Sequence, residues 1–311
     1  MSHCVLRNAE LECHHSIRSP QFIPVTIIEA INKAAKKLSE QGISTARLDA
    51  EVLLRHILSR DRAWLLAHIQ EDLDETNRRI YEQAVDRRAK REPLQHITKQ
   101  QEFWGLEFLV TPDVLIPRPE TELIIESVLG AAEHREKPLI IIDLCTGSGC
   151  IAVSLAKELQ AARIVAIDKS PRALSVAREN ALRHDVAERI RFLEGDLFEP
   201  LEALDIHGQA DIIVSNPPYV PSGDQRTLQP EVRAYEPAMA LFAGPDGTEI
   251  HRKIIDSAPR FLKTRGVLIM EMGLGQADVL VKMVRHAGDY GPAEILKDLA
   301  GINRVIVTRK K

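Results

Sequence analysis

Four polar residues stand where predicted strands end in the second half of the chain. Each follows an apolar run, and the four are Asp143, Asp168, Asp196 and Asn216. Because parallel strands end at one edge of a sheet, these side chains are expected around one crevice, where open α/β sheets bind ligands. A lone Asp at a strand end is more often a cap or a turn residue. The set of four therefore predicts a site.

A glycine loop follows the first of these strands. Its residues are Cys145, Thr146, Gly147, Ser148 and Gly149. Glycines let the backbone approach a ligand closely, and the spacing formally satisfies the dinucleotide fingerprint. Asp168, about twenty residues on, is placed to accept both hydroxyls of a ribose. The turn at Asp196 and Leu197 suits an adenine ring and its amino group. Together they predict a nucleoside-bearing ligand, and NAD still fits.

The fourth strand ends in Asn216-Pro217-Pro218-Tyr219. The prolines fix their own φ and donate no hydrogen bond, so the strand must stop and a stiff turn follows. The Asn216 side-chain oxygen and the Pro217 carbonyl can accept hydrogen bonds from an NH2 group, while Tyr219 packs on its plane. That geometry orients a nitrogen for in-line attack on a sulfonium methyl group. From the motif alone, an ordinary strand exit remains the alternative.

The elements that position these residues alternate between strand and helix after residue 137. This alternation, with short connections, predicts an α/β fold with a mostly parallel sheet and helices on both faces. The last two strands are joined too closely for a parallel crossover, so they should form an antiparallel hairpin. Strands are predicted at 139–144, 163–168, 190–195, 211–215, 266–272, 293–297 and 304–308, and helices at 150–159, 171–183, 248–262 and 276–286.

The first third of the chain has a different pattern. Four amphipathic stretches between residues 26 and 91 predict a small helical domain, with Ile80, Ala84, Val85 and Ala89 facing inward on the last helix. Aromatic and apolar residues around Gly105 predict a β-hairpin. The predicted divisions are a loose N-terminal extension (1–23), a helical domain (24–92), a hairpin connector (93–122) and an α/β domain (123–311).

Composition narrows the class of protein. The 311 residues carry a net charge of −4, which weakens the case for a dedicated duplex-DNA binder. No apolar run approaches the roughly 20 residues needed to cross a bilayer, and no secretory signal is evident. Four scattered cysteines make no disulfide framework or metal site, and Cys145 and Cys150 are expected to be packing residues. A cytoplasmic protein, without membrane attachment or a metal, is predicted.

The glycine loop, Asp168 and residues 216–219 resemble class I S-adenosylmethionine-dependent methyltransferases that modify amide or exocyclic amino nitrogens. From about residue 25 onward the chain is similar to the HemK or PrmC family of bacterial peptide chain release factor glutamine N5-methyltransferases. The segments that carry this second resemblance are 47–54, 101–105, 115–122, 235–237 and 298–304.

The resemblance implies a Rossmann-like class I methyltransferase fold with a seven-stranded, mostly parallel sheet and an antiparallel C-terminal hairpin. It implies S-adenosylmethionine as cofactor, S-adenosylhomocysteine as product and class 1 release factors as protein substrate, methylated at the glutamine of their Gly-Gly-Gln loop. The helical domain is implied to help dock that substrate, and no direct contact with nucleic acid is expected.

The resemblance also implies roles for single residues. Cofactor contacts fall on Cys145, Thr146, Gly147, Ser148, Gly149, Asp168, Asp196, Leu197 and Asn216. The substrate grip falls on Asn216, Pro217, Pro218 and Tyr219, with Asn216, Pro217 and Tyr219 as catalytic residues. Arg118 and Glu120 are implied to lie beside the cofactor.

Three alternatives stay open. Cys145 stands where the family more often has Gly, and the loop spelling also resembles the sister enzyme that methylates a glutamine of ribosomal protein L3. An adenine-N6 methyltransferase would use the same Asn-Pro-Pro-Tyr motif, but it must flip a base and needs a basic recognition region. A non-catalytic nucleotide-binding module would have no use for that motif.

Overall fold

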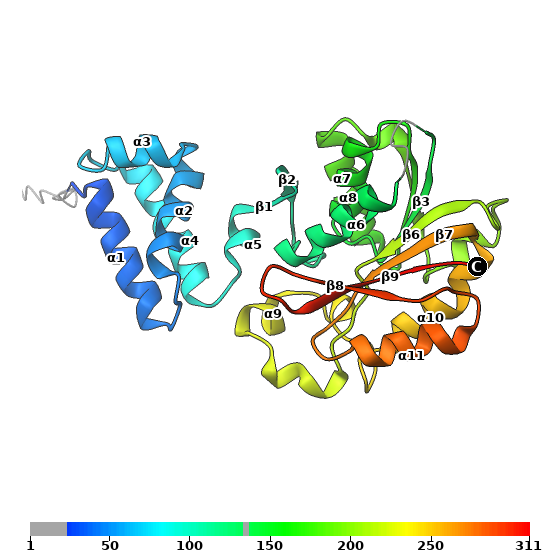
Figure 1. The fold of residues 1–311 in the computed structure, drawn as a ribbon. Coiled ribbons are helices and arrows are strands. Elements are labelled where there is room, and N and C mark those ends of the chain that lie inside the picture. Colours follow the sequence, from blue (N-terminus) through cyan, green and yellow to red (C-terminus); the bar gives the residue numbers. More distant parts are fainter. Residues whose placement is uncertain (1–23, 133–136) are drawn as a thin grey trace, which may run out of the picture.

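Two bodies of different secondary structure follow one another in the computed structural model, which describes residues 24–132 and 137–311. Helices α1–α4, called the helical bundle below, lie to one side of a sheet and are joined to it through α5 and the hairpin β1–β2 (Figure 1). The bounds are α1 Ile27–Glu40, α2 Ala46–Leu58, α3 Arg62–Ala67, α4 Glu75–Ala89, α5 Leu94–Thr98, β1 Gln100–Phe103, β2 Leu106–Leu109, α6 Glu122–Ala131, β3 Ile140–Leu144, α7 Cys150–Glu158, β4 Arg163–Asp168, α8 Pro171–Arg183, β5 Ile190–Glu194, β6 Ala210–Ser215, α9 Pro230–Tyr235, α10 Glu249–Ser257, β7 Leu262–Glu271, α11 Ala277–Ala287, β8 Glu294–Lys297 and β9 Asn303–Arg309.

The helical bundle forms where the sequence predicts it. α1 begins in a capping box, in which the Thr26 hydroxyl accepts from the Glu29 amide and the Glu29 carboxylate accepts from the Thr26 amide. The apolar faces of α1, α2 and α4 share one core. The one-turn helix α5 was not predicted. It begins after Pro93, whose fixed φ suits a helix start. The predicted extension at residues 1–23 lies outside the described residues.

The inward face of α4 differs from the prediction at one position. Ile80 is 47% exposed, whereas its neighbour Tyr81 is 2% exposed. Tyr81 lies three and four residues before Ala84 and Val85, so all three share one face of the helix. The Tyr81 hydroxyl donates to the Ala50 carbonyl at 3.0 Å, which satisfies the polar atom that would otherwise disfavour burial.

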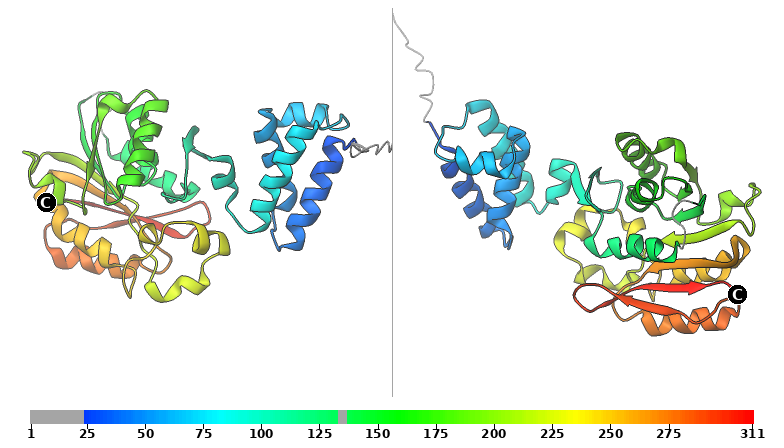
Figure 2. Two further views of the ribbon diagram at one scale, coloured as in Figure 1. Left: turned by 180° about the vertical axis from the view of Figure 1, so that it is seen from behind. Right: turned by 45° about the horizontal axis from the view of Figure 1, so that its top comes forward.

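The second body confirms the predicted α/β fold. Its seven strands have the order β5-β4-β3-β6-β7-β9-β8, in which β3 to β7 are parallel and β9 pairs antiparallel with both β7 and β8. The predicted C-terminal hairpin is therefore present. Helices α6, α7 and α8 pack on one face and α10 and α11 on the other, as Figures 1 and 2 show.

The hairpin and α10 show how local chemistry sets element bounds. Trp104 and Gly105 have φ of 54° and 67° and form the two-residue turn between β1 and β2, where positive φ matches the strand twist. The helix predicted at 248–262 is shorter: α10 ends at Ser257, because Pro259 cannot donate a helical hydrogen bond, and β7 begins at Leu262.

Candidate active site

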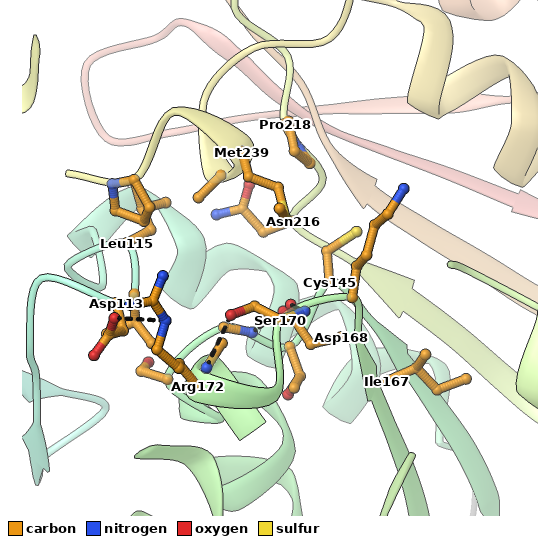
Figure 3. Close-up of a pocket in the computed structure, with 18 of the residues that line it drawn as sticks. Asp113, Leu115, Cys145, Ile167, Asp168, Ser170, Arg172, Asn216, Pro218 and Met239 are labelled. Atoms are coloured by element: carbon orange, nitrogen blue, oxygen red, sulfur yellow. Dashed lines mark hydrogen bonds and ion pairs between the residues drawn. The ribbon is translucent and has the colours of Figure 1, made fainter. Parts of the chain in front are cut away.

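A cavity of about 370 Å³ opens at the carboxyl edge of the parallel strands (Figure 3). This volume falls in the range of about 300–1,000 Å³ that small-molecule sites occupy. The loops after β3, β4, β5 and β6 meet there, as expected for strand ends at one edge. The predicted site residues that line it are Cys145, Thr146, Gly147, Ser148, Asp168, Asp196, Leu197, Asn216 and Pro218.

The glycine loop is shaped by positive φ values and by a buried acid beneath it. Cys145, Gly147 and Gly149 have φ of 60°, 56° and 79°. Under the loop, the Thr146 hydroxyl donates to the fully buried Asp143 at 2.6 Å, and burial raises the pKa of Asp143 to about 7. Asp143 supports the loop from below and does not line the cavity.

Gly149 has a packing role instead of a place in the cavity wall. A Cβ at this position would lie 3.0 Å from the Ala177 Cβ, so glycine allows α7 to begin against α8. Only glycine combines that close approach with a left-handed backbone at low cost. The loop therefore holds the N-terminus of α7 close under the cavity.

Asp168 is held in one orientation by backbone amides. Its Oδ1 accepts from Ser170 at 2.8 Å and its Oδ2 from Gly147 at 2.9 Å. Burial raises the pKa of Asp168, and these hydrogen bonds oppose the rise. Each carboxylate oxygen retains a second lone pair, so Asp168 can still accept from a ligand hydroxyl. Next to it, Lys169 pairs with Asp196 at 3.3 Å.

Asn216 sits on the cavity wall with its amide fixed by a chain of hydrogen bonds. Asn216 Nδ2 donates to Thr121 Oγ1 at 3.1 Å, and Thr121 Oγ1 donates to Glu271 Oε2 at 2.6 Å. The Tyr219 hydroxyl donates to Glu271 Oε1 at 3.2 Å. With Nδ2 bonded to Thr121, Asn216 Oδ1 is the atom left to accept from a ligand in the cavity.

Tyr219 and Pro217 do not line the cavity. The Tyr219 ring lies behind the wall, where a Cβ at Gly273 would be 3.0 Å from its Cδ2. The expectation that this ring packs on a substrate amide stays a prediction. Pro217 is buried, and the role predicted for it needs only its backbone carbonyl.

Arg118 and Glu120 also lie outside the cavity wall. Arg118 Nη2 donates to Glu236 Oε1 at 2.5 Å, and the same carboxylate accepts from the Ile116 amide at 3.3 Å. The segment around Arg118 therefore contributes to the wall through other residues, Pro117 and Thr121 among them. Arg118 braces that wall against the segment after α9.

Sequence reasoning missed the wall opposite the glycine loop. Asp113 and Arg172 form an ion pair of 3.3 Å at this cavity, and Met239 lies beside Asn216 in Figure 3. Arg172 lies on the predicted helix α8 and Leu115 in the segment 115–122, but no local pattern indicates that these side chains meet at the cavity. The cavity residues outside the prediction are Pro112, Asp113, Val114, Leu115, Pro117, Thr121, Cys150, Ile151, Ile167, Lys169, Ser170, Arg172, Ala173, Gly195, Pro237, Met239, Ala240, Phe242, Ile250 and Lys253.

Burial raises the pKa of both cysteine thiols near the loop, that of Cys150 to about 12. A raised pKa disfavours the nucleophilic thiolate, in keeping with packing roles. Over residues 24–132 and 137–311 no cluster of three metal-ligating side chains occurs. In the same residues no helix is long and apolar enough to span a membrane.

The sheet order, the glycine loop and the strand-end acids define a class I methyltransferase fold with a cavity at the sheet edge. Residues 29–98 match the PrmC N-terminal domain, and residues 135–295 match a methyltransferase domain. Release factor glutamine methyltransferases from Geobacter sulfurreducens and Moorella thermoacetica are 43% and 40% identical to the chain, covering 90% and 92% of it and 95% and 99% of their own lengths. The chain belongs to the release factor glutamine methyltransferase family.

A solved structure of the release factor-specific protein-(glutamine-N5) methyltransferase from Alicyclobacillus acidocaldarius is 27% identical. It matches with a TM-score of 0.39 over 66% of this chain and 99% of that chain.

Proposed function

We propose that this protein transfers a methyl group from S-adenosylmethionine to the side-chain amide nitrogen, N5, of the glutamine in the Gly-Gly-Gln loop of class 1 peptide chain release factors. The observation that carries the proposal is Asn216, whose oriented amide faces a cavity lined by the glycine loop and Asp168. Family membership supports the substrate, since the relatives are named release factor glutamine methyltransferases.

The cavity fits the proposed cofactor. The positive-φ backbone of Cys145 and Gly147 lets the loop approach a ligand without an intervening Cβ at Gly147. Asp168 would hold the ribose hydroxyls, and Asp196 with Leu197 would hold the adenine. S-adenosylmethionine supplies an electrophilic methyl group when bound.

The chain's own residues orient the nucleophile. Asn216 Oδ1 and the Pro217 carbonyl would each accept one N–H of the glutamine amide, which fixes the plane of the amide and so the direction in which its nitrogen faces the methyl group. Holding the nitrogen in line removes much of the entropic barrier to transfer. Asn216, Pro217 and Tyr219 are the proposed catalytic residues, and Pro218 completes the substrate grip.

The domain arrangement extends this proposal. The helical domain at 24–92 would dock the release factor, the connector at 93–122 would hold it beside the cavity, and residues 123–311 would carry the methyl transfer. A Gly-Gly-Gln loop projecting from the docked protein would then reach Asn216.

Methyl transfer to intact release factor tests the function directly. With S-adenosylmethionine labelled in the methyl group, we expect the label to appear on the release factor. Substituting the glutamine of its Gly-Gly-Gln loop by alanine should abolish the labelling. Ribosomal protein L3 and duplex DNA serve as alternative acceptors in the same assay. Label on either of these, with none on the release factor, would overturn the proposal.

A further inference from the structure

Glu271 is a buried carboxyl group next to the Asn-Pro-Pro-Tyr motif. It is the last residue of β7 and is 1% exposed. Both of its oxygens are used: Oε2 accepts from the Thr121 hydroxyl and Oε1 from the Tyr219 hydroxyl. A buried carboxyl costs free energy unless it is hydrogen-bonded, and these two bonds offset that cost.

The direction of these hydrogen bonds fixes how the Asn216 amide is turned. An ionised carboxylate can only accept, so the hydroxyl of Thr121 must donate to it. The remaining lone pairs of Thr121 Oγ1 can then only accept, so Asn216 must turn its NH2 group toward Thr121. The carbonyl oxygen of Asn216 is left for the cavity, which is the atom a substrate amide needs.

We propose that Glu271 is a positioning residue that, acting through Thr121, holds the Asn216 amide with its oxygen toward the substrate and its NH2 group away from it. This inference rests on the proposed function. Glu271 touches neither the cavity nor the reacting atoms and acts through two neighbours. Through Tyr219 it also anchors the far end of the motif, so one carboxylate restrains both ends of the turn.

The groups that face Glu271 decide its charge. Burial raises the pKa of Glu271 to about 7, and the charge of Glu120 adds to this rise. Hydrogen bonds from Thr121 and Tyr219 and the charge of Arg304 lower the pKa of Glu271. His251 Nε2 donates to the Glu271 backbone carbonyl at 2.7 Å, and burial lowers the pKa of His251 to about 4. His251 is therefore neutral over the range in which Glu271 titrates.

Protonation of Glu271 reverses the direction of the hydrogen bonds from Glu271 through Thr121 to Asn216. A protonated Glu271 can donate to Thr121, which frees the Thr121 hydroxyl to donate to Asn216 Oδ1 and turns the NH2 group of Asn216 into the cavity. Turnover at saturating substrates should consequently fall as pH falls through about 7. Asp143, under the glycine loop, titrates in the same range, so the part of the fall that Glu271→Gln removes is the part that belongs to Glu271.

The test compares wild type with Glu271→Gln, Thr121→Val and Thr121→Ser, using release factor as substrate. Thr121→Val keeps the side-chain shape and removes the hydroxyl that links Glu271 to Asn216. We therefore expect kcat to fall by about 10²-fold, the loss of rate that a misplaced reacting group causes. Thr121→Ser restores the hydroxyl and most of the turnover. Glu271→Gln, which can donate as well as accept, should lower kcat and abolish the part of the acidic limb of the pH profile that belongs to Glu271. In Thr121→Val the buried Glu271 carboxylate loses a partner, so the melting temperature should fall, whereas the affinity for S-adenosylhomocysteine should change far less than kcat.

The outcomes separate two failures. If the wild-type enzyme does not methylate the release factor, the proposed function is wrong. Active wild-type enzyme, with wild-type kcat in Thr121→Val and an unchanged pH profile in Glu271→Gln, overturns the role of Glu271. Should Glu271→Gln unfold, the contrast between Thr121→Val and Thr121→Ser still decides.

Discussion

Asn216 owes its orientation to residues far from it in sequence. The strand β6 delivers it, and Ser215 fixes the end of that strand by donating to the Leu144 carbonyl at 2.8 Å. The two prolines then stop the strand, and Thr121 holds the amide from another segment. The side chain is thus constrained before any ligand binds, which is the condition for a low entropic barrier.

Asn216→Ala should separate catalysis from cofactor binding. The change removes the acceptor that would hold the substrate amide, so we expect kcat to fall by about 10²–10³-fold, the loss seen when one oriented hydrogen-bonding group is removed from an active site. Asp168, Asp196 and the glycine loop are untouched, so the affinity for S-adenosylhomocysteine, measured by calorimetry, should stay near wild type. Weakened binding with normal turnover would mean that Asn216 serves the cofactor.

At the residue scale, the sequence predicts residues that directly follow a strand, but it does not predict contacts between residues that are far apart in the chain. Asn216 and Asp168 follow apolar runs directly, so their places at the sheet edge were predictable. Thr121 lies in the segment 115–122, but no local pattern links it to Glu271, because the bond between them joins residues 150 positions apart. Only the pairing of β6 with β7 brings that carboxyl group beside the motif.

At the element scale, α8 ties the hairpin to the glycine loop through one buried side chain. Asn180 Oδ1 accepts from the Leu109 amide at 2.7 Å, and its Nδ2 donates to the Leu109 carbonyl at 3.0 Å and to the Ser148 carbonyl at 2.9 Å. Because the Asn180 side chain forms hydrogen bonds with the backbone of β2 and of the glycine loop, it holds both against α8. The hairpin β1–β2 therefore helps to position the glycine loop.

Asn180→Ala should destabilise the protein and loosen the loop. The partly buried Leu109 amide and carbonyl and the buried Ser148 carbonyl lose their partner, at a cost of up to about 1–3 kcal/mol for each group left unsatisfied. We expect a lower urea midpoint and weaker S-adenosylhomocysteine binding. The control is Glu179→Ala, an exposed neighbour on the same helix that pairs with Arg183, with an expected change within about 0.5 kcal/mol. Equal losses in both variants would contradict the role of Asn180.

Element type was more predictable than element bounds. The alternation of strand and helix segments along the sequence indicated β3 to β9 correctly. The central strands are buried on both faces and therefore appear as continuous apolar runs. The end of α10 was misplaced, since apolar residues continue past Ser257 and the stop comes from Pro259. The segment around Met239, which lines the cavity, and α9 before it have no periodic pattern, so this part of the cavity wall could not be predicted from the sequence.

At the scale of the whole molecule, the helical bundle is tied to the segment that leads into the cavity. Glu231 on α9 accepts from Arg88 at 3.1 Å and from Arg91 at 2.9 Å, and the Tyr235 hydroxyl donates to the Lys90 carbonyl at 2.8 Å. The chain then runs from α9 into the cavity wall. α9 lies on the side of the second body that faces the bundle (Figures 1 and 2), and we expect a protein docked on the bundle to approach the wall from that side.

Leu299 should contribute to substrate docking. It is fully exposed in the loop between β8 and β9, which extends toward the side of the bundle in Figures 1 and 2. Asp298 accepts from the Ala300 and Ile302 amides, so the loop presents this apolar side chain on a stiff turn. Leu299→Asp should raise KM for the release factor about tenfold, the effect of losing roughly 1.4 kcal/mol of interface contact, with kcat and the melting temperature unchanged. The matched control is Leu182→Asp, an exposed leucine on α8, which should leave KM unchanged. An unchanged KM in Leu299→Asp, or the same rise in both variants, would exclude a specific role for this loop, because a general effect of surface charge acts on both positions alike.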